Sequence, residues 1–396
     1  MSLATGTAAD SFVPSDEEHR IRETVATIAN RYGRAYMQRC SEEERPPVEL
    51  WDELAAAGYL GVNIPAEYDG GGLGMTALAA VGEELAFAGT PLLLILVSPA
   101  IAGSVLARHG SPEQRERWLR GIGRGDLRMA FAITEPDAGT NTHNLAMQAT
   151  RTDDGGWRLR GTKVFISGVE MAHALFVVAR TGERDATTGY GRLSLFIVDV
   201  EAPGLQRTVI PTATRGADRQ WQLFFDDVEV PADRLVGNEG EGLRLVFDGL
   251  NPERIMTAVQ CTGIGRQALD KASAYARERV VWSAPIGSHQ GVSHPLAEAK
   301  IELELARTMT RKACALYDAG AKGAGEAANM AKFAAAEAGV KCVDRAIQAH
   351  GGNGVALEYG LADLWWGVRT AKIAPVSREM ILNYVAEHSL RLPRSY

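Results

Sequence analysis

Residues 131–140 of the chain read Phe131-Ala132-Ile133-Thr134-Glu135-Pro136-Asp137-Ala138-Gly139-Thr140. A short apolar run ends at a Thr-Glu-Pro step, and a turn of small residues then leads to a second threonine. The threonines offer hydroxyl groups, and the Ala-Gly pair lets a ligand approach the backbone closely. A second segment, Lys163-Val164-Phe165-Ile166-Ser167-Gly168, repeats this combination of aromatic, apolar and hydroxyl side chains. Together the segments are suited to hold a flat ring with polar edges between strand ends, although each alone also fits an ordinary exit from a strand.

The spacing of apolar residues changes twice along the chain. From residue 12 to 128, apolar side chains recur every three or four residues, as at Ile21, Val25 and Ile28, which predicts helices. Between 129 and 238 the period is two, and turn-rich clusters separate candidate strands at 157–167, 175–180, 193–200 and 221–230. From 239 to 396 the chain is rich in alanine and helical again. The pattern predicts an α+β protein of three domains, 12–128, 129–238 and 239–396.

Composition narrows the possible partners. A formal net charge of −7 argues against nucleic acid or an anionic membrane surface as the main partner. The four cysteines are widely separated and the eight histidines lack metal-binding spacing, so we expect neither a disulfide framework nor a metal site. The most apolar stretch, 91–106, is too short to span a bilayer, and no apolar signal core opens the chain. These features predict a cytoplasmic protein without membrane insertion.

In their order and spacing, the 131–140 and 163–168 segments resemble the flavin-binding segments of the acyl-CoA dehydrogenase family. Arg279, Trp282 and Gln290 fall where that family places an Arg, an aromatic residue and a Gln against the ADP end of the flavin, with Trp282-Ser283 where Phe-Gly is common. The stretch Gln348-Ala349-His350-Gly351-Gly352-Asn353-Gly354 resembles the family's Gln-x-x-Gly-Gly-x-Gly turn, which contacts a flavin bound mainly by the neighbouring subunit.

The resemblance implies an N-terminal helical domain, a central β-barrel-like domain and a C-terminal four-helix bundle, with FAD between the last two. It also implies an acyl-CoA substrate, a homotetramer, and reoxidation by an electron-transferring flavoprotein. The residues that it places at FAD are Phe131, Ile133, Thr134, Gly139, Thr140, Phe165, Ser167, Arg279, Trp282, Gln290, Gln348, Gly351 and Gly352. Those expected at the substrate are Thr140, Arg254 and Arg378.

In the family reaction a carboxylate takes the α-proton of the thioester while a hydride passes from the β-carbon to flavin N5. In many members the base is the Glu of a Tyr-Glu-Gly-Thr-Ser segment, but an ungapped alignment from Arg369 puts Arg378 at that position. A guanidinium cannot accept a proton at working pH. The isovaleryl and long-chain branches carry the base on a helix of the third domain, and Leu250-Asn251-Pro252-Glu253-Arg254-Ile255 matches that segment. We therefore expect Glu253 to be the base, with the Arg378 backbone N–H as a donor to the thioester carbonyl.

Other interpretations of these residues remain open. Asn251, Pro252 and Glu253 would also form a good helix start, as N-cap, first residue and acidic second residue. Glu379, next to Arg378, is a second possible base. Two other functions also remain open. The Arg at position 378 would suit an oxidase or monooxygenase of the same fold that uses O₂, and loss of the base would suit a catalytically inactive acyl-CoA-binding relative. The acyl chain is not fixed by the sequence, although a base at Glu253 favours long or branched chains.

One pair of acidic residues is expected to have no special role. Glu83 and Glu84 are adjacent on a predicted helix, where neighbours do not face each other, so we expect no carboxylate pair there.

Overall fold

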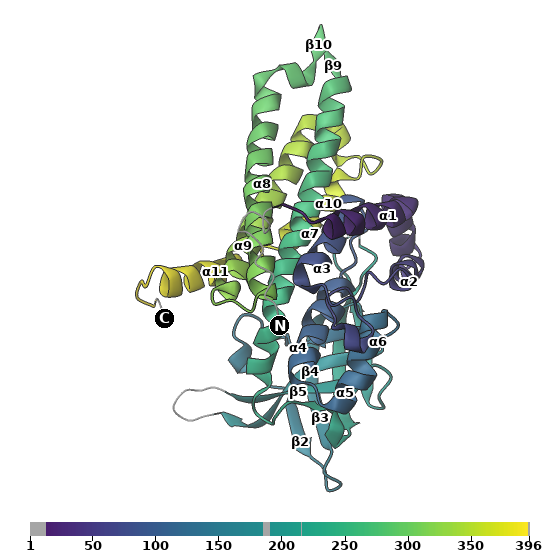
Figure 1. The fold of residues 1–396 in the computed structure, drawn as a ribbon, viewed down its shortest axis with the longest axis vertical. Helices are drawn as coiled ribbons and strands as arrows, with labels where there is room; N and C mark the ends of the chain where they lie inside the picture. Colours follow the sequence, from purple (N-terminus) through teal and green to yellow (C-terminus); the bar gives the residue numbers. More distant parts are fainter. Residues whose placement is uncertain (1–12, 185–190, 215, 395–396) are drawn as a thin grey trace.

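The computed structural model describes residues 13–184, 191–214 and 216–394, so the outer limits of the expected domains, residues 12 and 396, lie outside the described residues. Figure 1 shows long green helices that extend away from a β-sheet, which lies at the other end of the molecule. The N-terminal helices, in purple and blue, pack beside the junction of the two. This order of helices, sheet and helices confirms the predicted α+β architecture.

The N-terminal helices begin where the sequence signals a start. Ser15 accepts a hydrogen bond from the Glu18 N–H at the first turn of α1, and Ser111 and Gln114 form a capping box at α5. The apolar stretch 91–106 is buried over most of its length, as expected, and includes a π-helical segment. The elements are α1 (Asp16–Glu42), α2 (Val48–Ala56), α3 (Gly74–Phe87), the π-helical Leu96–Gly103, α4 (Ser104–His109), α5 (Pro112–Gln114) and α6 (Arg120–Arg124).

Within the described part of the chain, eight strands form one sheet in the order β6-β7-β3-β2-β4-β5-β8, with β1 beside β4. The strands are β1 (Met129–Ala132), β2 (Gln148–Arg151), β3 (Trp157–Ser167), β4 (Ala174–Arg184), β5 (Gly191–Asp199), β6 (Leu205–Ile210), β7 (Gln220–Val230) and β8 (Leu235–Val236). The four predicted strands are confirmed as β3, β4, β5 and β7. Strand β1 pairs in parallel with β4. Residues 133–140 follow β1 directly and therefore begin at the end of that strand.

The C-terminal part is a helical bundle. Its elements are α7 (Gly242–Glu278), the hairpin β9 (Val280–Val281) and β10 (Ala284–Pro285), α8 (Gln290–Asp318), α9 (Ala324–His350), α10 (Leu361–Thr370) and α11 (Arg378–Tyr384). Helices α7, α8 and α9 pack together, and α10 lies against α7 and α9. A Cβ at Gly339 of α9 would come within 3.1 Å of the Cys261 carbonyl of α7, so a small residue lets these helices meet closely. None of the described helices combines the length and hydropathy of a membrane span.

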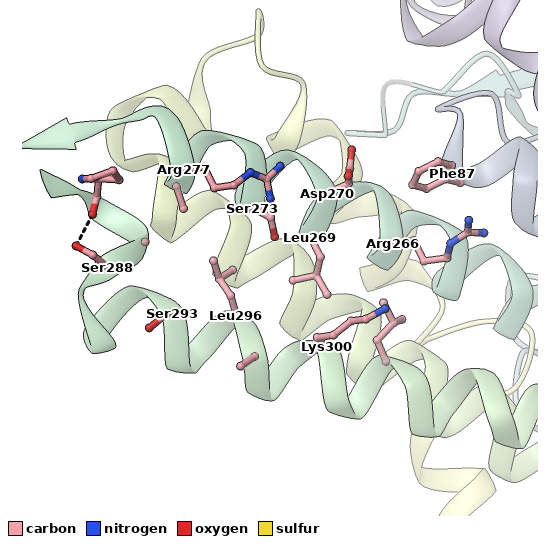
Figure 2. Close-up of a pocket in the computed structure, with 15 residues that line it drawn as sticks. Phe87, Arg266, Leu269, Asp270, Ser273, Arg277, Ser288, Ser293, Leu296 and Lys300 are labelled. Carbon is pink, nitrogen blue, oxygen red and sulfur yellow. Dashed lines mark hydrogen bonds between the residues drawn. The ribbon is translucent and has the colours of Figure 1, made fainter.

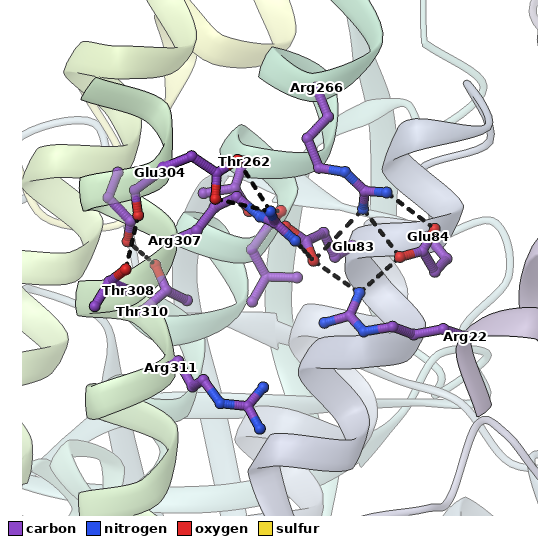
Figure 3. Close-up of polar contacts among 12 residues, drawn as sticks. Arg22, Glu83, Glu84, Thr262, Arg266, Glu304, Arg307, Thr308, Thr310 and Arg311 are labelled. Atoms are coloured by element: carbon purple, nitrogen blue, oxygen red, sulfur yellow. Dashed lines mark hydrogen bonds and ion pairs between the residues drawn. The ribbon is translucent and has the colours of Figure 1, made fainter. Parts of the chain in front are cut away.

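A buried ion-pair network ties α3 to the helices around it (Figure 3). Glu83 and Glu84 are buried, and Arg22 of α1 places Nη1 2.7 Å from Glu83 Oε2 and 2.6 Å from Glu84 Oε1. Arg307 of α8 lies 2.8 Å from Glu83 Oε1, and Arg266 of α7 lies 2.9 Å from Glu84 Oε1. One guanidinium therefore binds both carboxylates, a shared structural role that the sequence did not predict.

The network also sets the ionisation of Glu83. Burial alone would raise the pKa of this carboxyl, but the hydrogen bond from Arg307 and the charges of Arg307, Arg22 and Arg266 lower it to about 2. Glu83 is therefore a carboxylate at any pH near neutral, and it connects the N-terminal helices to the C-terminal bundle.

Candidate functional site

The two segments singled out in the sequence are held together by a buried ion pair. Lys163 of β3 is fully buried, and its Nζ lies 2.8 Å from Glu135 Oε1 and donates to the Ile133 carbonyl at 2.9 Å. The Glu135 carboxylate also accepts hydrogen bonds from the backbone N–H groups of Ala146 and Met147. Burial lowers the pKa of Lys163 to about 8, so the ammonium remains charged at neutral pH. The pair fixes the exit of β1 against β3.

Replacing the cation of this pair should destabilise the protein. In Lys163→Met the buried Glu135 carboxylate loses its counter-ion, and breaking a buried pair in this way costs about 3–5 kcal/mol. Denaturant unfolding at pH 7 measures the loss. Arg158→Met is the matched control, because it breaks the exposed Arg158–Glu229 pair of the same strand and should change little. Equal losses in the two variants would contradict a special role for the buried pair.

Residues of the first segment lie around this pair. Phe131 is half-buried on β1, opposite Phe176 of β4. Ile133 and Thr134 are half-buried between β1 and the pair, and the Thr134 carbonyl accepts a hydrogen bond from the Val164 N–H at 2.9 Å. This bond holds Thr134 of the first segment against Val164, the neighbour of Phe165 on β3.

The surface next to the pair is open. Gly139 and Thr140 are exposed, and a Cβ added at Gly139 would meet nothing within 4 Å. The Phe165 side chain is 61% exposed, and its φ is +56°. A bulky residue at positive φ costs about 1–3 kcal/mol, and such strain concentrates at functional sites. Ser167 Oγ donates to Gln220 Oε1 at 3.0 Å, which orients the hydroxyl at the end of β3.

A second group of predicted residues lies at the hairpin between α7 and α8. Arg279 and Gln290 are exposed, and Trp282 is 89% exposed with a φ of +56°. Below the hairpin, α7 and α8 enclose an open groove of about 890 Å³ (Figure 2). Its charged lining residues are Arg266, Asp270, Arg277 and Lys300. This end of the bundle therefore offers an open aromatic ring next to an excess of positive charge.

The glycine-rich turn after α9 packs near the same hairpin. Gln348, Gly351 and Gly352 are exposed. Asn353 Nδ2 donates to the Tyr275 hydroxyl at 3.1 Å, which places the turn against the last turns of α7. Figure 1 shows the hairpin β9–β10 at the end of the molecule opposite the sheet. The residues predicted at FAD therefore form two separate groups, one where β1 and β3 end and one at the hairpin end of the bundle.

The structure places Glu253 inside a helix. Helix α7 begins at Gly242, so the interpretation of Asn251–Glu253 as a helix start is wrong. Asn251 instead accepts a hydrogen bond from Arg254 Nη1 at 2.8 Å. Among the described residues, the buried Glu253 Oε2 has no hydrogen-bond partner. Burial raises the pKa of Glu253 to about 7, against the opposing charges of Arg254 and Lys332.

The Arg378 side chain is held by another residue. Its Nε donates to Glu337 Oε1 at 2.7 Å, and Lys372 donates to the second oxygen of that carboxylate at 2.8 Å. The Arg378 backbone N–H donates to the Lys372 carbonyl at 3.0 Å, so the structure does not leave this donor free, contrary to the expectation. The neighbouring Glu379 side chain is 72% exposed and offers no buried base.

Four buried or paired residues of the site were not predicted from the sequence: Glu135, Lys163, Lys332 and Glu337. A signal was present for Lys163, because its position has the same parity along β3 as the inward-facing Trp157 and Leu159. A charged side chain on the inner face of a strand requires a buried partner. Over the described residues, no group of three or more His, Cys, Asp or Glu is placed to hold a metal ion.

Models of the N-terminal, middle and C-terminal domains of acyl-CoA dehydrogenases match residues 15–126, 130–228 and 240–390. The chain is 51% identical over 387 residues to acyl-CoA dehydrogenase FadE12 of Mycobacterium tuberculosis (strain ATCC 25618 / H37Rv). This alignment covers 98% of the present chain and 99% of the relative. It resembles a glutaryl-coenzyme A dehydrogenase–glutaryl-CoA complex with a TM-score of 0.91 and 28% identity, over 97% of this chain and 98% of the other. An FAD complex of PigA matches with a TM-score of 0.88 and 26% identity, over 96% of this chain and 99% of the PigA chain. The chain therefore belongs to the acyl-CoA dehydrogenase family of FAD-dependent oxidoreductases.

Proposed function

We propose that this enzyme introduces a double bond between Cα and Cβ of an acyl-CoA thioester, with Glu253 as the base that takes the α-proton. The observation that carries the proposal is the buried Glu253 oxygen without a hydrogen-bond partner, inside a helix where capping does not explain it. A base works best when its pKa lies near the operating pH, and the pKa of Glu253 is about 7. Arg378, at the alternative base position, is bound to Glu337 instead.

The charges around Glu253 suit the reaction. The α-proton of a thioester is weakly acidic, so the developing enolate must be stabilised by nearby positive charge and shielded from water. Arg254 is buried beside Glu253, and Lys332 is buried on α9. When the Glu253 carboxylate accepts the proton it becomes neutral, and the two cations then face the negative charge on the substrate.

The residues at the ends of β1 and β3 fit FAD. Their hydroxyls and the exposed Phe165 ring suit a flat ring with polar edges, and FAD supplies the acceptor for the β-hydride at N5. Arg279 suits the pyrophosphate, because a guanidinium is always charged and binds phosphate oxygens in pairs. We assign Phe131, Ile133, Thr134, Gly139, Thr140, Phe165 and Ser167 to the flavin ring, and Arg279, Trp282, Gln290, Gln348, Gly351 and Gly352 to the ADP end.

Because these two groups lie apart in one chain, we infer that neighbouring copies share each FAD. Ile301 and Leu305 on α8 are 62% and 66% exposed, which suits an interface between subunits. A homotetramer, the family's usual assembly, would bring the first group of one copy next to the second group of its neighbour. We also propose an electron-transferring flavoprotein as the electron acceptor and the cytoplasm as the compartment, in keeping with the four free cysteines among the described residues.

We assign Thr140 and Arg254 to the acyl-CoA. Thr140 is exposed beside the flavin segment, and Arg254 is buried next to the base. A base on α7 favours a long or branched acyl chain, as the resemblance to the isovaleryl and long-chain branches implies.

The half-reaction tests this function directly. The purified protein is titrated anaerobically with short, branched and long acyl-CoAs, and the visible flavin band is followed. Bleaching by one class of chain, with formation of the 2-enoyl-CoA, is the expected result and identifies the substrate class. Rapid reoxidation of the reduced flavin by oxygen would favour the oxidase alternative. Tight acyl-CoA binding without bleaching by any thioester would favour the inactive relative and overturn the proposal.

A further inference from the structure

Lys332 is a buried lysine at the centre of α9. Its side chain is 1% exposed, and its Nζ donates to the Val376 carbonyl at 2.5 Å. Val376 lies in the connection between α10 and α11, two residues before Arg378. A fully buried lysine is rare unless it is paired, so the carbonyl contact alone does not account for the residue.

The charged and titratable groups facing Lys332 come from two other helices. On α7 they are Glu253, Arg254 and Cys261, and on α11 the exposed Glu379. Tyr384 of α11 faces Arg254. Burial raises the pKa of the Cys261 thiol to about 12, so this side chain carries no charge near neutral pH. Of the two carboxylates that act on Lys332, Glu379 is exposed and Glu253 has a buried oxygen without a hydrogen-bond partner. Gly325 and Gly339 of α9 lie against Asn251 and Cys261 of α7, so Lys332, halfway between these glycines, lies beside the stretch of α7 that carries Glu253.

The effect between the two residues is mutual. Burial lowers the pKa of Lys332 to about 8, and the Glu253 charge acts in the opposite direction. In turn, the Lys332 charge lowers the pKa of Glu253, which burial has raised. A neutral side chain at position 332 would leave Arg254 as the counter-charge and would make Glu253 harder to ionise.

We propose that Lys332 is a positioning residue of the dehydrogenation, which holds the Val376 segment against the bundle and keeps Glu253 in the ionised form that accepts the α-proton. The inference rests on the proposed role of Glu253 as the base. A purely structural lysine would affect folding and the Val376 segment but not the ionisation of Glu253, and this difference can be measured.

The test compares the holoenzyme with Lys332→Met and Lys332→Arg. The rate of anaerobic bleaching by the best acyl-CoA is measured between pH 5.5 and 9.5, a range of about four units that brackets both groups. In Lys332→Met the rise of rate with pH should move upward by about one unit, since the cation that favours the carboxylate is gone. Lys332→Arg keeps the charge and should keep the parent's rise. Lys341→Met, at a partly exposed position of the same helix that pairs with Glu302 of α8, is the control and should behave as the parent.

Two further measurements keep the outcome decisive. The infrared band of the protonated Glu253 carboxyl, identified by its loss in Glu253→Gln, should titrate at higher pH in Lys332→Met, whatever its activity. If Lys332→Met does not fold, Lys332→Arg remains informative: arginine stays charged over the whole range, so the Glu253 carboxyl should titrate at the parent's pH or below it.

An unchanged midpoint in Lys332→Met, or a midpoint that moves upward in Lys332→Arg, would overturn the role of Lys332 alone. Bleaching that survives in Glu253→Gln would instead overturn the base assignment and this inference with it.

Discussion

Glu253→Gln should slow anaerobic flavin bleaching by about 10²–10⁴-fold, the contribution that a positioned general base makes to a proton transfer. The amide has nearly the shape of the carboxyl but accepts no proton. Because this exchange changes neither the size nor the outline of the side chain, the variant should retain its flavin and its fold. Stopped-flow absorbance of the flavin band, with the flavin content and melting temperature measured beside it, checks each part of this prediction.

Two neighbouring variants make the result specific. Glu379→Gln removes the exposed carboxylate, and Arg378→Gln removes the side chain that stands at the usual base position. Both should stay within about tenfold of the parent rate, or 1.4 kcal/mol. In the parent the rate should rise with pH through about 7, because only the ionised Glu253 accepts the proton. A Glu379→Gln variant that loses bleaching while Glu253→Gln keeps it would reverse the assignment.

Glu83→Gln should lower the free energy of unfolding by about 3–5 kcal/mol, the cost of removing one partner from a buried ion pair. The Glu83 side chain is 7% exposed, and its oxygens lie 2.7 Å from Arg22 and 2.8 Å from Arg307. The neutral amide would leave these guanidiniums without half of their counter-charge between three helices. Denaturant unfolding at pH 7 measures the effect, and Glu116→Gln, which breaks the exposed pair with Arg120 on the surface, should change little.

The same residue gives the stability a defined dependence on pH. The pKa of Glu83 falls from 4.5 to about 2 on folding, so its ion pairs stabilise the protein fully above about pH 4.5 and lose that effect as the pH falls towards 2. Unfolding curves between these limits should therefore converge for the parent and Glu83→Gln. A difference that stayed constant down to pH 2 would show that the network does not depend on this charge.

Elements with a clear period could be predicted, and elements without one could not. Strand β3 runs over the predicted 157–167, because turn-rich residues bound it and apolar residues alternate along it. Strand β2 has only one buried residue in four, and β6 has none, so neither shows an alternating pattern. Their place in the sheet comes from antiparallel pairing with β3 and β7, the strands that follow them in the chain.

At the site, the sequence around a residue predicted less than the residues that fold against it. The order of motifs indicated Glu253, but its surroundings depend on Lys332, which is 79 positions away on a helix whose buried face is otherwise mostly alanine. Asn251-Pro252-Glu253 has the local form of a helix start, yet packing carries α7 through it without a break. Likewise, helical geometry alone kept Glu83 and Glu84 apart, and only the arrival of Arg22 from α1 joined them.

The separation of the two FAD-facing groups along the molecule has a genetic consequence. If neighbouring copies share each site, a defect near Phe165 and a defect near Arg279 in different copies do not always meet in the same site. A mixed assembly of the two defective chains then contains one site with both defects and another with neither. Two recessive alleles, one in each group, would restore each other's activity, whereas two alleles in the same group would not.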